Sequence, residues 1–212
     1  MRVTNVFFRL AGNPVEAIVS TDAWRRWEVE SFRLLHAPDY SAAPGPDGTP
    51  LLDTLPGESL APLLDAGTLS PEMLASAGRE LRRAHGLHSD YFGGAWSHGD
   101  PHTGNFVFDP ATARARLIDF EMRHLRTLAA DQRHADDLLV LLQDVCGRCA
   151  ADAWRPLARA FLQGYGRDEI AALLRAKLHV PRGFGRLWWG VRTSWMHRSE
   201  LERRMGEMRI SI

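Results

Sequence analysis

The chain has 212 residues, 45% of them hydrophobic, which is enough to bury the core of one domain or of two small lobes. Its 26 acidic and 26 basic side chains cancel, so no overall field attracts the protein to nucleic acid or to a membrane surface. Arginine supplies almost all of the positive charge, because the only lysine is Lys177.

The first elements predicted along the chain are a hairpin and a helix. Residues 3–10 and 15–20 are rich in β-branched and aromatic side chains, and residues 11–14, Ala-Gly-Asn-Pro, are a turn signal between them. Asp22 is the expected N-cap of the following helix, whose apolar residues recur at helical spacing up to Pro38.

A change in composition after this helix suggests a domain boundary. Residues 38–50, which consist mostly of Pro, Gly, Ala, Ser and Asp, predict a loop. Residues 51–55 predict a strand, and residues 56–58 predict a turn. We therefore expect a reduced first lobe over residues 1–58 and a larger, mainly helical second lobe over residues 59–212.

The second lobe is predicted to alternate helices with two short strands. Ser70 and Pro71 are typical of a helix start, with an N-cap residue followed by proline. The expected helices cover residues 70–88, 130–145, 151–165 and 169–178, the strands cover 105–108 and 116–120, and an amphipathic stretch covers 186–208.

One string carries recognisable chemistry. Residues 98–105 read His-Gly-Asp-Pro-His-Thr-Gly-Asn, and residues 118–121 read Ile-Asp-Phe-Glu. Phosphoryl transfer needs a carboxylate near the acceptor hydroxyl and oxygen ligands that hold magnesium on the phosphates. Asp100, Asn105 and Asp119 supply these groups, if the intervening hairpin returns the chain to the loop.

These two motifs resemble those of the kinase-like phosphotransferases, including aminoglycoside kinases, choline kinases and lipopolysaccharide sugar kinases. The resemblance implies an α+β, protein-kinase-like two-lobe fold, with ATP and Mg²⁺ as cofactors. Carried over by position, it implies that Asp100 is the catalytic base and that Asn105 and Asp119 bind the metal and nucleotide. The implied acceptor is a hydroxyl of a small molecule or of a lipopolysaccharide sugar.

The resemblance assigns further roles in the second lobe. It implies that Asp137, with Asp136 as the second choice, accepts hydrogen bonds from the backbone of the catalytic loop. It also implies that His98 braces this loop and that His102 faces the substrate.

The first lobe departs from the family pattern. Glu30 suits the helix glutamate that pairs with a strand lysine, with Glu28 as the fallback, yet residues 1–100 contain no lysine and no glycine-rich G-x-G-x-x-G loop. Arginine is the available substitute for contacting phosphate. The candidates are Arg9, Arg25 and Arg26. The absence of G-x-x-x-x-G-K also excludes a P-loop kinase.

Two other functions fit parts of the sequence. A pseudokinase or nucleotide-binding regulatory module would keep the fold and lose turnover, because the lysine is missing. A metal-dependent hydrolase would instead gather His98, Asp100, His102 and Asp119 around a transition metal, but that scheme gives Asn105 no role.

The C-terminal stretch permits either packing or binding. Trp188, Val191 and Trp195 share one helix face, which is typical of a core stripe. The flanking arginines could instead hold an anionic acceptor or give peripheral membrane contact. They are Arg182, Arg186, Arg192, Arg198, Arg203 and Arg204.

The remaining expectations concern cysteines and location. Cys146 and Cys149 form a C-x-x-C without a second pair, which predicts two packed, reduced thiols. The N-terminal residues do not resemble a signal peptide, so a cytoplasmic location is expected.

Overall fold

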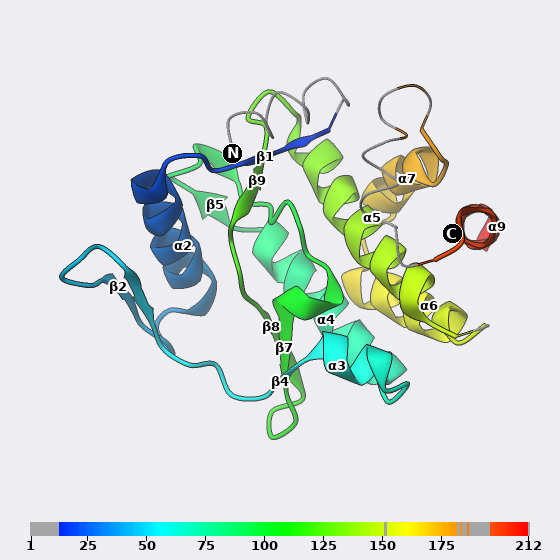
Figure 1. Cartoon of the computed structure of the whole chain (residues 1–212), viewed down its shortest axis with the longest axis horizontal. Coiled ribbons are helices and arrows are strands. Elements are labelled where there is room, and N and C mark those ends of the chain that lie inside the picture. Colours follow the sequence, from blue (N-terminus) through cyan, green and yellow to red (C-terminus); the bar gives the residue numbers. More distant parts are fainter. Residues whose placement is uncertain (1–12, 151, 182, 184–185, 187–195, 212) are drawn as a thin grey trace.

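The computed structural model describes residues 13–150, 152–181, 183, 186 and 196–211. Helices and small antiparallel sheets alternate along the chain, which confirms the predicted α+β class. In Figure 1, helix α2 and the β2–β3 hairpin lie at the left, the α5, α6, α7 and α9 helices lie at the right, and the strands that carry the motif residues lie between them.

The first helix, α2 (Thr21–His36), forms where the apolar spacing predicts it. Its N-cap is Ser20 and not Asp22, because the Ser20 hydroxyl accepts a hydrogen bond from Ala23 N–H at 3.3 Å. Strand β1 (Val15–Ala17) precedes the helix and pairs with β9 (Met122–His124), which follows the second motif. The predicted partner strand over residues 3–10 lies outside the described residues.

The segment after α2 is more ordered than its composition suggests. Strands β2 (Ala42–Pro44) and β3 (Pro50–Leu52) form an antiparallel hairpin, whose turn is closed by a backbone hydrogen bond of 2.8 Å between Gly45 and Thr49. Strand β2 lies inside the predicted loop, and β3 overlaps the strand predicted over residues 51–55. A short helix, α3 (Leu60–Asp65), follows strand β4 (Glu58–Ser59), and the sequence pattern did not predict this helix.

A three-stranded sheet carries the central motif. Its strand order is β4, β7 (Phe106–Asp109) and β8 (Arg114–Leu117), all antiparallel, and a 3₁₀ turn, η1 (Thr103–Asn105), leads into β7. Strands β5 (His88–Ser89) and β6 (Gly94–Ala95) form a separate small hairpin.

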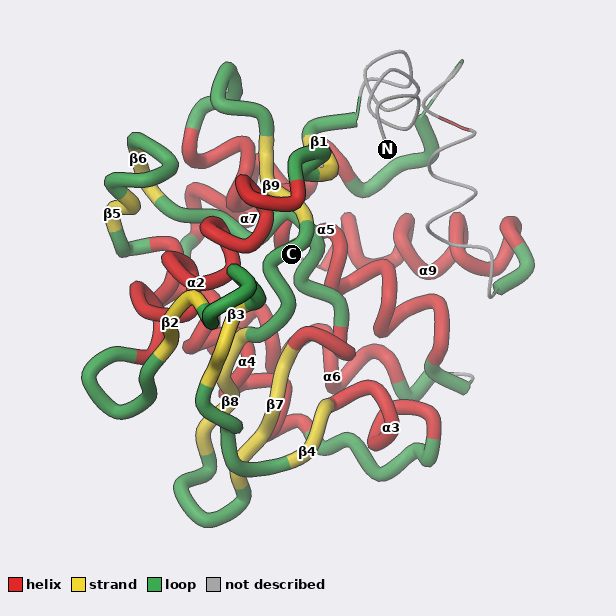
Figure 2. Tube along the Cα trace, turned by 60° about the vertical axis from the view of Figure 1, so that its left-hand side comes forward, coloured by secondary structure: helices red, strands yellow, loops and turns green. Residues whose placement is uncertain are grey.

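The remaining helices build the larger side of the molecule (Figure 2). They are α4 (Pro71–His85), α5 (Ala130–Arg148), α6 (Trp154–Tyr165), α7 (Asp168–Lys177) and α9 (Arg198–Ser211). As predicted, Ser70 caps α4, where its hydroxyl accepts a hydrogen bond from Met73 N–H at 3.4 Å. Helix α5 is almost wholly buried, so it forms the centre of this side.

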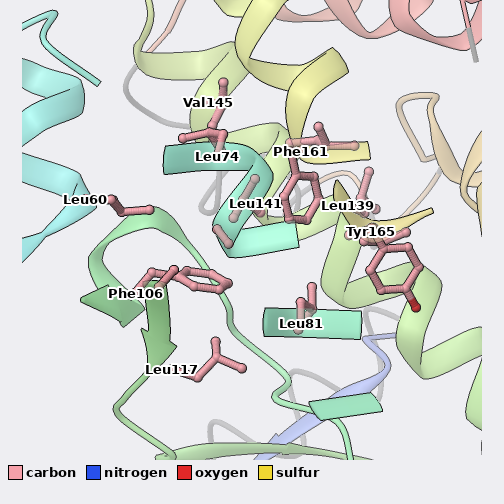
Figure 3. Packing of buried hydrophobic residues seen from close by; sticks show 14 of the residues in the cluster. Leu60, Leu74, Leu81, Phe106, Leu117, Leu139, Leu141, Val145, Phe161 and Tyr165 are labelled. Atoms are coloured by element: carbon pink, nitrogen blue, oxygen red, sulfur yellow. The ribbon is translucent and has the colours of Figure 1, made fainter. Parts of the chain in front are cut away.

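The apolar core joins these helices to the sheet (Figure 3). Its labelled members come from α3, α4, α5, α6, β7 and β8: Leu60, Leu74, Leu81, Phe106, Leu117, Leu139, Leu141, Val145, Phe161 and Tyr165. Burying large apolar side chains stabilises the fold by roughly 1.5–3 kcal/mol each. The sheet that carries the motif therefore rests on the helical core.

Two glycines let α4 and α6 pack closely. A Cβ atom at Gly78 would lie 2.2 Å from the Phe161 carbonyl oxygen, and one at Gly164 would lie 2.1 Å from the Ala75 carbonyl oxygen. Both distances are far below van der Waals contact, so only glycine fits at these two positions.

The C-terminal predictions are only partly testable on the described residues. Trp188, Val191, Trp195, Arg182 and Arg192 lie outside them. Within α9, glutamates pair with the three predicted arginines, with contacts from Arg198 to Glu202, from Arg203 to Glu200 and Glu207, and from Arg204 to Glu200. These ion pairs reduce the positive charge that α9 presents to an anionic surface.

Cys146 and Cys149 are buried free thiols, and burial raises the pKa of Cys149 to about 11. Arg204 donates hydrogen bonds to the carbonyl oxygens of both cysteines, at 2.9 and 2.7 Å, and so fastens α9 to the end of α5. No helix among the described residues is both long and apolar enough to cross a membrane.

Candidate active site

The antiparallel register of β7 and β8 brings the two motifs together. Phe106 lies opposite Leu117, and the ladder continues one step further, where Ile118 N–H donates to the Asn105 carbonyl oxygen at 3.0 Å. Asp119 follows Ile118 directly, so the hairpin returns the chain beside Asn105 as the spacing predicts.

His98 links the loop over residues 98–105 to Ile118, the residue before Asp119. Its Nδ1 accepts the Asp100 N–H at 3.3 Å, and its Nε2 lies 3.0 Å from the Ile118 carbonyl oxygen. The second contact requires Nε2 to carry the proton. Burial lowers the pKa of His98, which keeps the ring neutral near pH 7. His98 therefore braces the two segments that carry Asp100 and Asp119.

Asp137 on α5 holds the start of this loop. Its carboxylate is fully buried and accepts the backbone N–H groups of His98 at 2.9 Å and Gly99 at 2.8 Å, which is the contact implied by the family resemblance. Burial alone would raise the pKa of Asp137, but His124 and the hydrogen bond from His85 hold it well below its usual range. The carboxylate is therefore a permanent acceptor.

The backbone conformation at position 99 and the closeness of strand β9 both favour glycine. The φ of Gly99 is +93°, a conformation that L side chains rarely adopt, and a Cβ atom there would approach the Arg123 backbone to 3.3 Å. Strand β9 thus passes close to the loop, and glycine permits the approach.

Asp144 holds the other end of the loop, and no sequence motif marks this residue. Its carboxylate accepts the Thr103 N–H at 2.8 Å and the Thr103 hydroxyl at 2.5 Å. Arg148 lies one turn further along α5 and contacts both Asp144 and Thr103 at 3.3 Å. The available signal was spacing, because Asp144 follows Asp137 by seven residues and so shares its helix face.

Asn105 and His102 shape the loop from within. The Asn105 amide nitrogen donates to the Asp100 carbonyl oxygen at 2.9 Å, which leaves its carbonyl oxygen as the group able to bind a cation. His102 caps the 3₁₀ turn, since its Nδ1 accepts the Gly104 N–H at 3.0 Å. Its observed contact is therefore structural, and facing the substrate stays a prediction for the half-buried ring.

Asp119 is exposed and has a left-handed backbone, with φ of +65°. Asp is among the few residue types enriched in this conformation, and such outliers gather at functional sites. The next residue, Phe120, is fully buried and packs against His98, with ring centroids 5.4 Å apart. The turn thus anchors Phe120 inside and presents the Asp119 carboxylate outside.

The helix glutamate that reaches this turn is Glu28, and not Glu30. Glu28 is buried, and its carboxylate accepts the Phe120 N–H at 3.0 Å. Burial and the nearby negative charges of Asp119 and Glu121 raise its pKa to about 7. Glu30 follows Glu28 by two residues, so its side chain lies on nearly the opposite face of α2. There it is half-exposed and lies 3.6 Å from Arg33.

The candidate arginines of α2 point elsewhere. Arg25 donates to the Asp47 carbonyl oxygen at 3.0 Å, and Arg26 lies over the Tyr91 ring at 5.2 Å from its centroid. Both line a cavity of about 330 Å³ between α2 and the β2–β3 hairpin, together with Glu30. Arg9 lies outside the described residues.

The structure does not assemble the alternative hydrolase centre. Across the part of the chain that is described, no group of three or more His, Cys, Asp or Glu side chains is arranged to hold a metal ion. Both ring nitrogens of His98 and one of His102 are engaged in hydrogen bonds. Magnesium usually takes only one or two protein ligands and completes its shell with water and phosphate, so a group of this size is not required for it.

No protein-family model matches the chain, and no curated protein matches it either.

Proposed function

We propose that the protein is a phosphotransferase that uses ATP and Mg²⁺ to phosphorylate a hydroxyl group, within a protein-kinase-like two-lobe fold. The observation that carries the proposal is the convergence of the two motifs, with Asp100 and Asp119 on segments joined by His98 and with Asn105 next to Ile118. Carboxylates and an amide in this arrangement meet the needs of phosphoryl transfer.

Each site residue has a distinct task in this proposal. Asp100 accepts the proton of the acceptor hydroxyl, while the Asn105 carbonyl oxygen and the exposed Asp119 carboxylate hold the metal. When bound, magnesium would neutralise the charge on the nucleotide phosphates. Asp137, Asp144 and His98 keep the loop in position, because their hydrogen bonds fix its backbone at both ends.

The acceptor in this proposal is a small molecule or a lipopolysaccharide sugar, as in the family that the motifs resemble. We propose no nucleic-acid partner, since acidic and basic residues balance over the chain. The proposal includes peripheral membrane contact through the C-terminal Arg- and Trp-rich stretch over residues 186–208.

A second candidate function, a pseudokinase or nucleotide-sensing module, is favoured by the surroundings of Glu28. In kinases a lysine joins the equivalent glutamate to the phosphates. Here Glu28 accepts the Phe120 N–H instead, and the only lysine, Lys177, lies 3.5 Å from Asp136 on the helical side. Loss of the lysine weakens the positioning of phosphate and leaves the metal and base residues in place.

Turnover separates the two functions. The purified protein should hydrolyse or transfer phosphate from Mg-ATP, Asp100→Ala should reduce turnover by at least 100-fold with nucleotide affinity retained, and Asp119→Ala should also weaken Mg-dependent binding. Asp131→Ala is the control, because this exposed residue lies at the start of α5. Mg-dependent nucleotide binding without turnover in the wild type would favour the pseudokinase, and no nucleotide binding at all would contradict both functions.

A further inference from the structure

A second polar cavity lies on the side of β8 that faces the end of α2. It has a volume of about 100 Å³ and is lined by the C-terminal end of α2, the residues that follow it, α4 and β8. Three of its side chains are arginines, Arg83, Arg114 and Arg116. None of the residues assigned to the candidate active site lines it.

Arg116 is the unusual member, because its guanidinium is buried and one of its nitrogens, Nη1, lacks a hydrogen bond among the described residues. The residue is only 6% exposed. Its nearest carboxylate, Asp109, lies 3.6 Å away and already accepts hydrogen bonds from Ala111 N–H and the Thr112 hydroxyl. A buried cation left in this state is costly unless another group satisfies its donors.

Three arginines and two carboxylates line the cavity, so guanidinium donors predominate there. Arg83 is neutralised by Glu80, which binds it through two hydrogen bonds at 2.6 and 2.8 Å. Arg116 keeps its ion pair with Asp109, and Arg114 faces the exposed Asp39, which is the carboxylate besides Glu80 in the lining. The Arg116 guanidinium also lies over the Tyr40 ring, 5.2 Å from its centroid, and this contact fixes it in place.

We propose that this cavity binds one small oxyanion, such as inorganic phosphate, sulfate or the terminal phosphate of a monoester. A guanidinium presents a planar fork of donors that matches two oxygens of such an anion. The volume corresponds to about three water molecules and is therefore too small for a nucleotide or a sugar.

An anion in this cavity would lie beside the contact between the C-terminal end of α2 and strand β8. His36 Nε2 lies 2.8 Å from the Leu117 carbonyl oxygen, and Arg83 donates to the Leu35 carbonyl oxygen at 2.9 Å. Leu117 is two residues before Asp119, and α2 carries Glu28. An anion bound to Arg116 would thus stabilise the contact that sets the distance between this helix and the candidate active site.

The test is titration of the whole protein with sodium phosphate and sodium sulfate at constant ionic strength, followed by calorimetry and by the NMR resonances of the His36 ring, which lines the cavity. We expect saturable binding of both anions, a shift of the His36 resonances and a rise in the melting temperature. Arg114→Gln should weaken binding at least fivefold and Arg116→Gln should abolish it. O-phosphoserine binding would identify a monoester as a possible source of the phosphate.

Arg79→Gln is the matched control, because Arg79 is an exposed arginine of α4 that does not line the cavity. It should bind the anions as the wild type does. A saturating, non-hydrolysable ATP analogue with magnesium should also leave anion binding unchanged, which separates this site from the proposed nucleotide site. Absence of saturable binding, or equal affinity in Arg114→Gln and the wild type, would overturn the proposal. Arg114 is exposed, so its variant should fold even if Arg116→Gln does not.

Discussion

At the scale of single residues, the site depends on a few buried carboxylates whose neighbours differ. Asp137 accepts two backbone N–H groups and a hydrogen bond from His85, and it stays ionised. Glu28 accepts one N–H group beside two acidic residues, so its proton is held more tightly. The same functional group is therefore a fixed anion at one position and a titrating acid at the other.

The first prediction concerns Glu28. Its pKa is raised to about 7, so the stability that comes from its protonated form is complete below pH 4.5 and is lost as pH rises through 7. Glu28→Gln keeps an oxygen for Phe120 N–H and cannot ionise. We expect the variant to gain roughly 2–3 kcal/mol relative to the wild type between pH 5 and pH 8 in urea denaturation, since one pH unit corresponds to about 1.4 kcal/mol.

Glu30→Gln is the control for this measurement, since Glu30 is half-exposed on the opposite side of α2. It should change stability by less than about 0.5 kcal/mol at both pH values. An equal effect of Glu28→Gln at pH 5 and pH 8 would contradict the assignment of the raised pKa.

The second prediction concerns Asp137. Asp137→Asn keeps only one acceptor oxygen, so a backbone N–H of His98 or Gly99 loses its partner in a buried setting. We expect a loss of about 3 kcal/mol in the free energy of unfolding, by chemical denaturation. Asp131→Asn, in the exposed first turn of the same helix, should cost less than about 1 kcal/mol. Comparable losses in the two variants would show that Asp137 does not hold the loop.

At the scale of elements, the helices with strong apolar periodicity were predictable from the sequence. The pairing of strands that lie in turn-rich segments was not. Residues 130–145 and 151–165 carry patterns that α5 and α6 reproduce, with ends shifted by a few residues. Strand β3 overlaps the strand predicted over residues 51–55, but β2 and its pairing with β3 were missed because the turn-rich composition resembles a loop. Helix α3 was missed because its six residues are too short to show a period.

The third prediction tests the contact between α4 and α6. Gly164→Ala places a methyl group 2.1 Å from a backbone oxygen of α4, so the helices must separate. We expect a loss of about 1–3 kcal/mol or more, measured as a lower melting temperature. Gly206→Ala in α9 is the control with the opposite sign. Nothing lies within 4 Å of its added methyl group, so it should gain roughly 0.5–1 kcal/mol. A neutral Gly164→Ala would show that the two helices tolerate a wider spacing.

At the scale of the whole molecule, several buried histidines connect the helical side to the candidate site. His85 and His134 stack with ring centroids 3.8 Å apart, and His85 joins Tyr165 to Asp137 through hydrogen bonds of 2.8 and 3.0 Å. Burial lowers the pKa of both rings, that of His134 to about 3. Burial lowers the pKa of His36 and His98 as well.

The fourth prediction is acid sensitivity. Because these four histidines have folded-state pKa values below 6.5, the stability they confer is present above pH 6.5 and is lost as pH falls towards the folded pKa of each ring. The four rings act in the same direction, whereas Glu28 acts in the opposite direction. We expect the melting temperature to fall between pH 7 and pH 5.

Histidine variants identify the groups responsible. His134→Gln should flatten the pH profile between pH 7 and pH 5, whereas His88→Gln should leave it unchanged, because the His88 side chain is exposed. A constant melting temperature across this range in the wild type would refute the prediction.

The candidate site was predictable from sequence where residues are close along the chain. Asp100, Asn105 and Asp119 lie within twenty residues, so one loop and one hairpin set their geometry. Glu28 and Asp144 were harder to assign, because the choice between Glu28 and Glu30 depends on how α2 is rotated, and the role of Asp144 depends on a contact 41 residues away. Rotation and distant contacts are set by packing, which local patterns do not encode.

Asp137 and Asp144 on α5 fix the distance between the two ends of the loop over residues 98–105. Asp137 and Asp144 are seven residues apart, so they stand about 10 Å apart along the axis and nearly in line. One extra residue between them would lengthen the interval by about 1.5 Å and rotate Asp144 by about 100°. An insertion or deletion between these positions would therefore break the alignment of the two carboxylates, whereas a change in the length of α5 outside this interval would keep it.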